Sequence, residues 1–185
     1  MKNALVLIDI QNDYFIGGKN ELYLTKEAAE NASKVLNYFR NANLPIFHIK
    51  HISGANAAFF LPDTYGAEIN DIVAPMNDEK VIVKHAPNAF LKTNLADELR
   101  KQEISNLIIC GMMSHMCIDT TVRAAMDNGF TVTLLEDACT TKNLIWGDDK
   151  IPAQTVQKTI MASLNGVFAK VTKTDKFLES SKNNN

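Results

Sequence analysis

Apolar residues along the chain fall into two recurring patterns. Short, almost unbroken apolar runs, expected of strands covered on both faces, lie at 3–10, 46–52, 81–84, 107–111, 131–136 and 168–172. Segments in which apolar residues recur every three or four positions, typical of amphipathic helices, lie at 25–43, 93–101, 117–128 and 152–165. This alternation predicts a three-layer α/β/α fold built on a doubly wound, six-stranded, mainly parallel sheet.

Helix-end residues support the helical segments. Thr25 and Thr93 can cap the first two helices, and Pro152 suits the first turn of the last one. Gly129 and Gly166 follow the last two helices, where glycine commonly ends a helix.

Two connections lack a clear period. Residues 54–80 carry the adjacent Phe59 and Phe60, and residues 140–151 carry Trp146. Connections of this length in a compact domain are usually lids or interfaces, so we expect both to border a site or a second subunit.

Length and composition fit one globular domain. The 185 residues, 46% hydrophobic and 22% charged, predict a single domain over 1–178 and a polar, frayed tail over 179–185. The net charge of −2, without a basic block, argues against nucleic acid or an acidic membrane surface as a partner. No apolar run approaches a membrane span or a secretion signal, and the three cysteines form no CxxC motif, so we expect a cytoplasmic protein.

Three reactive side chains fall at the carboxyl ends of predicted strands, where open α/β sheets bind their ligands. Asp9 ends the first strand, Lys84 ends the third, and Cys117 opens the helix after the fourth. From position alone, Asp9 can equally cap the following loop, Lys84 can be a solvated strand-end residue, and Cys117 can be a small buried hydrophobe. Cys110 and Cys139 are interpreted as core residues.

Four motifs make the chain resemble the isochorismatase-like cysteine hydrolase family, which includes nicotinamidases and carbamoylsarcosine-type amidohydrolases. They are ALVLIDIQND at 4–13, VKH at 83–85 with NAF and TNL at 88–90 and 93–95, CGMMSHMCIDTTVRAA at 110–125, and LEDA at 135–138. The order and spacing of these motifs span almost the whole chain.

The resemblance implies hydrolysis of a C–N bond, of an amide or carbamoyl type, through a covalent thioester. Cys117 would be the nucleophile, Asp9 the general base and acid, and Lys84 the electrostatic support. It also implies a cis peptide bond between Met112 and Met113, and an oxyanion hole formed by the backbone N–H groups of Met113 and Cys117. The net pKa of the thiol is left open, because Lys84 lowers it and Asp9 raises it.

Metal ligands of the nicotinamidase type are not predicted. Those relatives carry an Asp-x-His motif after the second strand, whereas this chain has His48 and His51, which point to opposite faces of a strand. We therefore expect no metal and no cofactor.

An apolar pocket for a small-molecule substrate is expected beside the cysteine. Its predicted lining is Phe15, Phe90, His115 and Met116, with Tyr14 and the lid residues Phe59, Phe60 and Trp146 as further candidates. Each of these has packing as an alternative role, and the two lid phenylalanines could instead bury themselves against a second subunit. A homodimer or larger homo-oligomer is expected from the resemblance.

Three other functions stay open from sequence. One is isochorismatase-type cleavage of a vinyl ether with Asp9 as the acid. Another is a non-catalytic small-ligand binding module, and the third is a thiol redox protein that uses Cys117. The substrate is not predicted.

Overall fold

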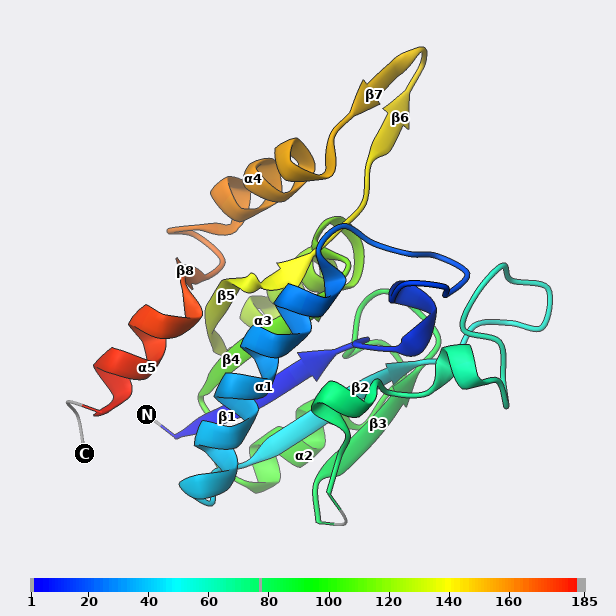
Figure 1. Cartoon of the computed structure of the whole chain (residues 1–185). Coiled ribbons are helices and arrows are strands. Elements are labelled where there is room, and N and C mark those ends of the chain that lie inside the picture. The colour runs from blue at the N-terminus through cyan, green and yellow to red at the C-terminus, as the bar shows by residue number, and fades with distance from the viewer. Residues whose placement is uncertain (1, 77, 183–185) are drawn as a thin grey trace.

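The computed structural model describes residues 2–76 and 78–182 and shows a six-stranded sheet with helices on both faces (Figure 1). The strand order is β3-β2-β1-β4-β5-β8, and every neighbouring pair is parallel. The strands are β1 Asn3–Ile8, β2 Ile46–His51, β3 Lys80–Lys84, β4 Asn106–Met112, β5 Thr131–Thr140 and β8 Lys170–Thr172. The doubly wound α/β fold predicted from the alternating pattern is thereby confirmed.

Helices cover the two faces of this sheet. They are α1 Thr25–Asn41, α2 Leu95–Lys101, α3 Asp119–Asp127, α4 Ala153–Leu164 and α5 Thr174–Lys182. Helix α1 lies on one face and packs against α5, while α2 and α3 lie on the other, and α4 packs against α3 (Figure 1). Short turns join these elements: η1 Asn12–Tyr14, η2 Tyr65–Ala67, η3 Asp71–Val73 and the π-helical η4 Ser114–Ile118. No helix within the described residues is both long enough and apolar enough to cross a membrane.

The central strands form the core because both of their faces are covered. Every residue of β1 from Ala4 to Ile8 is buried, and so is every residue of β4 after Asn106. The unbroken apolar runs in the sequence are thus explained by burial on both faces.

Gly111 allows β1 and β4 to approach each other at the edge that carries the reactive side chains. Its φ is +130°, and a Cβ atom there would lie 2.0 Å from the carbonyl oxygen of Ile8. Ile8 and Gly111 are register partners, so only glycine fits this position of β4.

Helix ends differ from the prediction in detail. Thr25 is the first residue of α1 rather than its N-cap, and its hydroxyl donates to the carbonyl of Tyr14 at 3.0 Å. The helix after β4 does not open at Cys117, because η4 precedes α3 and Cys117 lies inside that turn.

Residues 174–182 form α5. The prediction of a frayed tail that begins at residue 179 is therefore wrong for residues 179–182. Both the N–H and the hydroxyl of Thr174 donate to Asp137 Oδ1 at 2.8 Å, and Phe177 packs edge-on against Tyr38 of α1. These contacts come from distant parts of the chain, which a local pattern does not reveal. The rest of the predicted tail, 183–185, lies outside the described residues.

The two aperiodic connections have different structures. The first holds η2 and η3, and Phe60 within it is fully buried by its own chain, with its ring 4.6 Å from that of Tyr14. Burial of Phe60 against a second subunit is therefore ruled out.

The second connection forms an antiparallel hairpin, β6 Leu144–Trp146 and β7 Asp149–Ile151, which stands away from the main sheet (Figure 1). Trp146 on this hairpin is 80% exposed.

Candidate active site

Asp9, Lys84 and Cys117 come together at the carboxyl edge of the sheet. Asp9 follows β1, Lys84 is the last residue of β3, and Cys117 lies in η4 just after β4. Asp9 and Lys84 are 0% exposed and Cys117 is 5% exposed, although each lies near the end of an element. The prediction that these residues share one edge follows from parallel topology, and the structure shows them in one cluster.

Backbone geometry at Asp9 turns the chain out of β1. Its φ of +52° lies in the left-handed region, which Asp tolerates better than most residues. The Asp9 N–H donates to the carbonyl of Ile49 at 3.0 Å, and its own carbonyl accepts from Gln11 N–H at 2.9 Å. The strand therefore ends at Ile8, and the carboxylate is held by its backbone at the sheet edge.

Lys84 Nζ lies at the centre of the cluster. It is 2.7 Å from Asp9 Oδ2 and 3.2 Å from Cys117 Sγ. It also lies 3.0 Å from the carbonyl oxygen of Ala86 and 2.8 Å from Nδ1 of His51. The ammonium thus contacts both the acid/base candidate and the nucleophile candidate.

Burial dominates the electrostatics of the two acidic groups. Burial raises the pKa of Asp9, while Lys84 and the adjacent Cys117 act in the opposite direction. Burial also raises the pKa of the Cys117 thiol, and Asp9 adds to this rise, whereas Lys84 lowers it. Burial therefore favours the protonated thiol of Cys117, and the nearby Asp9 carboxyl is a group that could accept its proton.

The loop after Asp9 forms hydrogen bonds with residues 60–70 and with the end of β2. Gln11 donates to the carbonyl oxygens of His51 and Ala67, at 2.8 Å each, and accepts from His51 N–H at 2.7 Å. Asp13 Oδ2 accepts from Phe60 N–H at 2.7 Å. The polar residues of the IDIQND segment thus hold together the loops that border the cysteine.

Gly66 packs directly on this loop. A Cβ atom on Gly66 would lie 2.2 Å from the Asp13 carboxylate. Only a residue without a side chain leaves room for that carboxylate.

Met113 and Cys117 contribute the backbone of the turn after β4. The Met112–Met113 peptide bond is cis, and Met113 precedes the first residue of η4. The carbonyl of Met113 accepts from the N–H groups of Met116 and Ile118, at 3.0 and 3.2 Å.

The predicted pocket residues have different surroundings. His115 is half-buried, and its Nδ1 lies 2.5 Å from the hydroxyl of Thr141. Met116 exposes 41% of its surface, and Phe15 is partly buried against the core.

Phe90 packs against another aromatic residue. Its ring stacks on Phe130, with ring centroids 5.9 Å apart, and Phe130 precedes β5 at the amino edge of the sheet. Phe90 therefore packs against the core, and its contact with a substrate stays a prediction.

His48 and His51 point to opposite sides of β2, as their spacing predicts. His48 Nε2 lies 2.8 Å from Glu79 Oε2, whereas His51 faces Lys84. Ligand atoms of Asp9, His51 and Cys117 lie within 4.8 Å of one another, close enough to share one ion. Lys84 Nζ already contacts all three residues, so the space an ion would need is taken by an ammonium, and these residues do not fit a metal.

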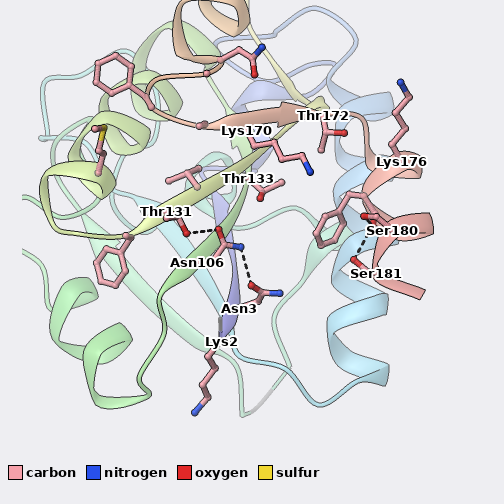
Figure 2. Close-up of a pocket in the computed structure, with 18 of the residues that line it drawn as sticks. Lys2, Asn3, Asn106, Thr131, Thr133, Lys170, Thr172, Lys176, Ser180 and Ser181 are labelled. Carbon is pink, nitrogen blue, oxygen red and sulfur yellow. Dashed lines mark hydrogen bonds between the residues drawn. The ribbon is translucent and has the colours of Figure 1, made fainter. Parts of the chain in front are cut away.

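A large cavity lies at the other edge of the sheet, near the amino ends of β1, β4 and β5 (Figure 2). Its volume is about 1470 Å³, and Lys2, Lys170 and Lys176 are among its lining residues. None of Asp9, Lys84 and Cys117 lines it, so it is separate from the cluster described above.

Sequence reasoning missed two residues that belong to this cluster. They are His51, for which the sequence suggested only metal binding, and Gln11, in the loop after Asp9. Both lie within three residues of a strand end at the reactive edge, and this position is the signal that could have found them. Their partners, however, are 33 or more positions away along the chain.

Comparison with known proteins assigns this arrangement to a family. Residues 3–176 match the isochorismatase domain. An uncharacterised isochorismatase family protein of Bacillus subtilis, YddQ, is 49% identical over 97% of this chain and 100% of its own length. A crystal structure of an isochorismatase from Pseudomonas putida is 36% identical with a TM-score of 0.89, covering 94% of this chain and 89% of that one. A more distant relative, Nicotinamidase 3 of Arabidopsis thaliana, is 27% identical over 76% of this chain and 74% of its own length. With the family's fold and a buried acid, lysine and cysteine at its reactive edge, this chain belongs to the isochorismatase family of hydrolases.

Proposed function

We propose that the protein is a metal-independent cysteine hydrolase that cleaves a C–N bond of a small amide or carbamoyl-type molecule through a thioester on Cys117. The contact of Lys84 Nζ with both Asp9 Oδ2, at 2.7 Å, and Cys117 Sγ, at 3.2 Å, carries this proposal. A hydrolase with a buried acid beside a buried thiol has the parts that nucleophilic catalysis needs.

Formation of the thioester begins with proton transfer from Cys117 to Asp9. Sγ attacks the carbonyl carbon, and the resulting oxyanion is stabilised by the backbone N–H groups of Met113 and Cys117. Asp9 then gives its proton to the departing amine as the C–N bond breaks. The raised pKa of Asp9 suits a carboxyl that must both take and give this proton.

Release of the product repeats these steps with water. Asp9 takes a proton from a water molecule, whose oxygen attacks the thioester carbon. The tetrahedral intermediate collapses, Cys117 leaves and regains a proton from Asp9, and the acid product departs. Lys84 lies beside Cys117 and lowers the energy of its thiolate.

A relative named for amide cleavage supports the choice of bond. Nicotinamidase 3 shares three quarters of its length with this chain. We extend only the bond class to this protein, because the Asp-x-His motif of nicotinamidases is absent from the sequence.

A second candidate is vinyl-ether cleavage with Asp9 as the acid. The observation in its favour is the raised pKa of Asp9, since a protonated carboxyl could donate to a vinyl carbon. In this reaction Cys117 would not be needed.

Mass spectrometry of acid-quenched mixtures separates the candidates. Wild-type protein, Cys117→Ala and the control Cys110→Ala are each incubated with small amides, carbamoyl compounds and isochorismate. An acyl adduct on wild type and Cys110→Ala, absent from Cys117→Ala, is the expected result. Turnover of isochorismate retained in Cys117→Ala would support the ether reaction. A panel that yields neither adduct nor turnover would count against catalysis and favour a ligand-binding role.

A further inference from the structure

His51 has no part in the reaction as written above, yet its imidazole lies directly against the catalytic lysine. His51 Nδ1 is 2.8 Å from Lys84 Nζ, and the two residues are register partners at the ends of β2 and β3. Neighbouring parallel strands therefore place this histidine and this lysine side by side.

Only one protonation state of His51 fits this contact. An ammonium donates three hydrogen bonds and accepts none, so Nδ1 must carry a lone pair. The imidazole is then neutral, with its proton on Nε2. A doubly protonated ring would set an N–H group against the N–H groups of Lys84.

The charged and titratable groups around His51 favour this neutral state. Burial lowers the pKa of His51 to about 4, and the charges of Lys84 and His85 act in the same direction. Asp9 and Cys117 are the other titratable groups of the cluster.

Two neighbours hold the imidazole in place. Gln11 bonds both the N–H and the carbonyl of His51, at 2.7 and 2.8 Å. The ring of Phe60 lies against it, with ring centroids 6.0 Å apart. Gln11 and Phe60 are fully buried, so both neighbours of the imidazole are held in place by the surrounding core.

We propose that His51 is a positioning residue of the hydrolase, whose neutral imidazole accepts a hydrogen bond from Lys84 and so holds the ammonium fixed between Asp9 and Cys117. This inference rests on the proposed function, because it assumes that Lys84 serves the reaction of Cys117. His51 itself acts through Lys84 and transfers no proton.

The physical reason is the cost of a buried ammonium. Lys84 is fully buried, and a buried ammonium needs acceptors in the protein in place of water. An apolar residue at position 51 would remove one of the acceptors that fix the ammonium beside Cys117, and would thus weaken the positive field that lowers the pKa of Cys117.

The test compares His51→Leu, which has no acceptor, with His51→Asn, whose Oδ1 stands as many bonds from Cα as Nδ1 does. The rate of Cys117 alkylation by iodoacetamide is measured against pH by peptide mass spectrometry. We expect the apparent pKa of Cys117 to rise by about one unit in His51→Leu, which slows alkylation about tenfold at a fixed pH below that pKa. His51→Asn should stay close to the wild-type rate.

The matched control is His48→Leu, three positions away on the opposite side of β2. It removes a histidine from the same strand but leaves Lys84 untouched, so the rate should not change. Wild-type kinetics in His51→Leu, or equal slowing in His51→Asn and His51→Leu, would overturn the proposal.

Nitrogen-15 NMR of the histidine rings of wild-type protein tests the same idea without a variant. We expect His51 to carry its proton on Nε2 at neutral pH, and a proton on Nδ1 would contradict the proposal even if a variant failed to fold. Failure of the proposed function would look different. Cys117 would then react no faster than Cys110 and Cys139 in wild type, whatever the state of His51.

Discussion

The carboxylate of Asp9 lies 2.7 Å from the ammonium of Lys84, and neither side chain is exposed to solvent. Removing one partner of such a pair leaves the other buried without its countercharge, which typically costs about 3–5 kcal/mol. Lys84→Met should fall at the lower end of that range, because burial favours protonation of Asp9 once the opposing charge of Lys84 is gone.

Urea unfolding of Lys84→Met, Asp9→Asn and the double variant measures this coupling. We expect the double variant to lose less stability than the sum of the single losses. Strictly additive losses would show that the two groups do not interact.

Asp9→Asn should separate thiol reactivity from catalysis. The negative charge of Asp9 raises the pKa of Cys117, so an uncharged residue there increases the thiolate fraction. Alkylation of Cys117 at pH 7 is therefore expected to speed up, while hydrolysis falls by about 10²-fold or more because the variant lacks the general base that we propose. Rates of iodoacetamide labelling and of substrate turnover check the two effects. Slower labelling in Asp9→Asn would mean that Asp9 activates the thiol at rest.

Cys110 and Cys139 should resist the same reagent. Burial raises the pKa of all three thiols, but only at Cys117 does a neighbouring ammonium, that of Lys84, act to lower it. Unlike Cys117, neither has an ammonium among its described hydrogen-bond partners. Peptide mapping after brief labelling should find the modification on Cys117, and it serves as the internal control for every labelling experiment above.

Gly111→Ala should unfold the protein or cost about 3 kcal/mol or more, because it combines a positive φ with a clash in the core. The added methyl group would lie 2.0 Å from the carbonyl oxygen of Ile8. The control is Gly129→Ala, with a φ of +87° and no atom within 4 Å of the added Cβ, expected to cost about 1 kcal/mol. Thermal and denaturant unfolding compare the stability of the two variants. Equal losses of stability would show that β1 and β4 can move apart to make room for the added methyl group.

Acid should weaken the contact of β2 with the loop that precedes β3. Burial opposes ionisation of Glu79, but hydrogen bonds from Arg40, the Met76 N–H and His48 hold the pKa of Glu79 at about 2. Because this value lies below the unfolded pKa of 4.5, the contribution to stability is present above pH 4.5 and lost as pH falls toward 2.

Glu79→Gln should lower stability by about 2 kcal/mol at pH 7, as expected for hydrogen bonds to a charged group. The difference from wild type should shrink below pH 4. The control is Glu98→Gln on the surface, which should cost less because solvent screens its pairs with Lys80 and Lys101. Denaturant midpoints between pH 7 and pH 3 measure the stability of wild type and of each variant. If Glu79→Gln differed from wild type by the same amount at every pH, the contribution of ionised Glu79 to stability would be contradicted.

The β6–β7 hairpin should take part in self-association. Ile145 and Trp146 are 78% and 80% exposed, and an isolated two-stranded hairpin is only marginally stable in water. Light scattering after gel filtration is expected to show a dimer or larger assembly for wild type. It should show a smaller species for the double variant Ile145→Ser, Trp146→Ser. A wild-type monomer would contradict this expectation.

Much of the fold was predictable because its signals are local. The apolar run in β1 and the helical period of α1 are each complete within one stretch of sequence. By contrast, α5 was missed because its stability depends on contacts of Thr174 with Asp137 and of Phe177 with Tyr38. When a helix is stabilised mainly by residues far away in the sequence, its own residues give little sign that it is helical.

The site shows the same division. The sequence by itself determined that Asp9, Lys84 and Cys117 share one edge, because parallel strands present their carboxyl ends together. Only the tertiary structure decided which neighbours complete the cluster. His51 meets Lys84 through the register of β2 with β3, and the ring of Phe90 stacks on that of Phe130. Topology follows from the order of elements along the chain, whereas register and side-chain direction depend on packing between segments far apart in sequence.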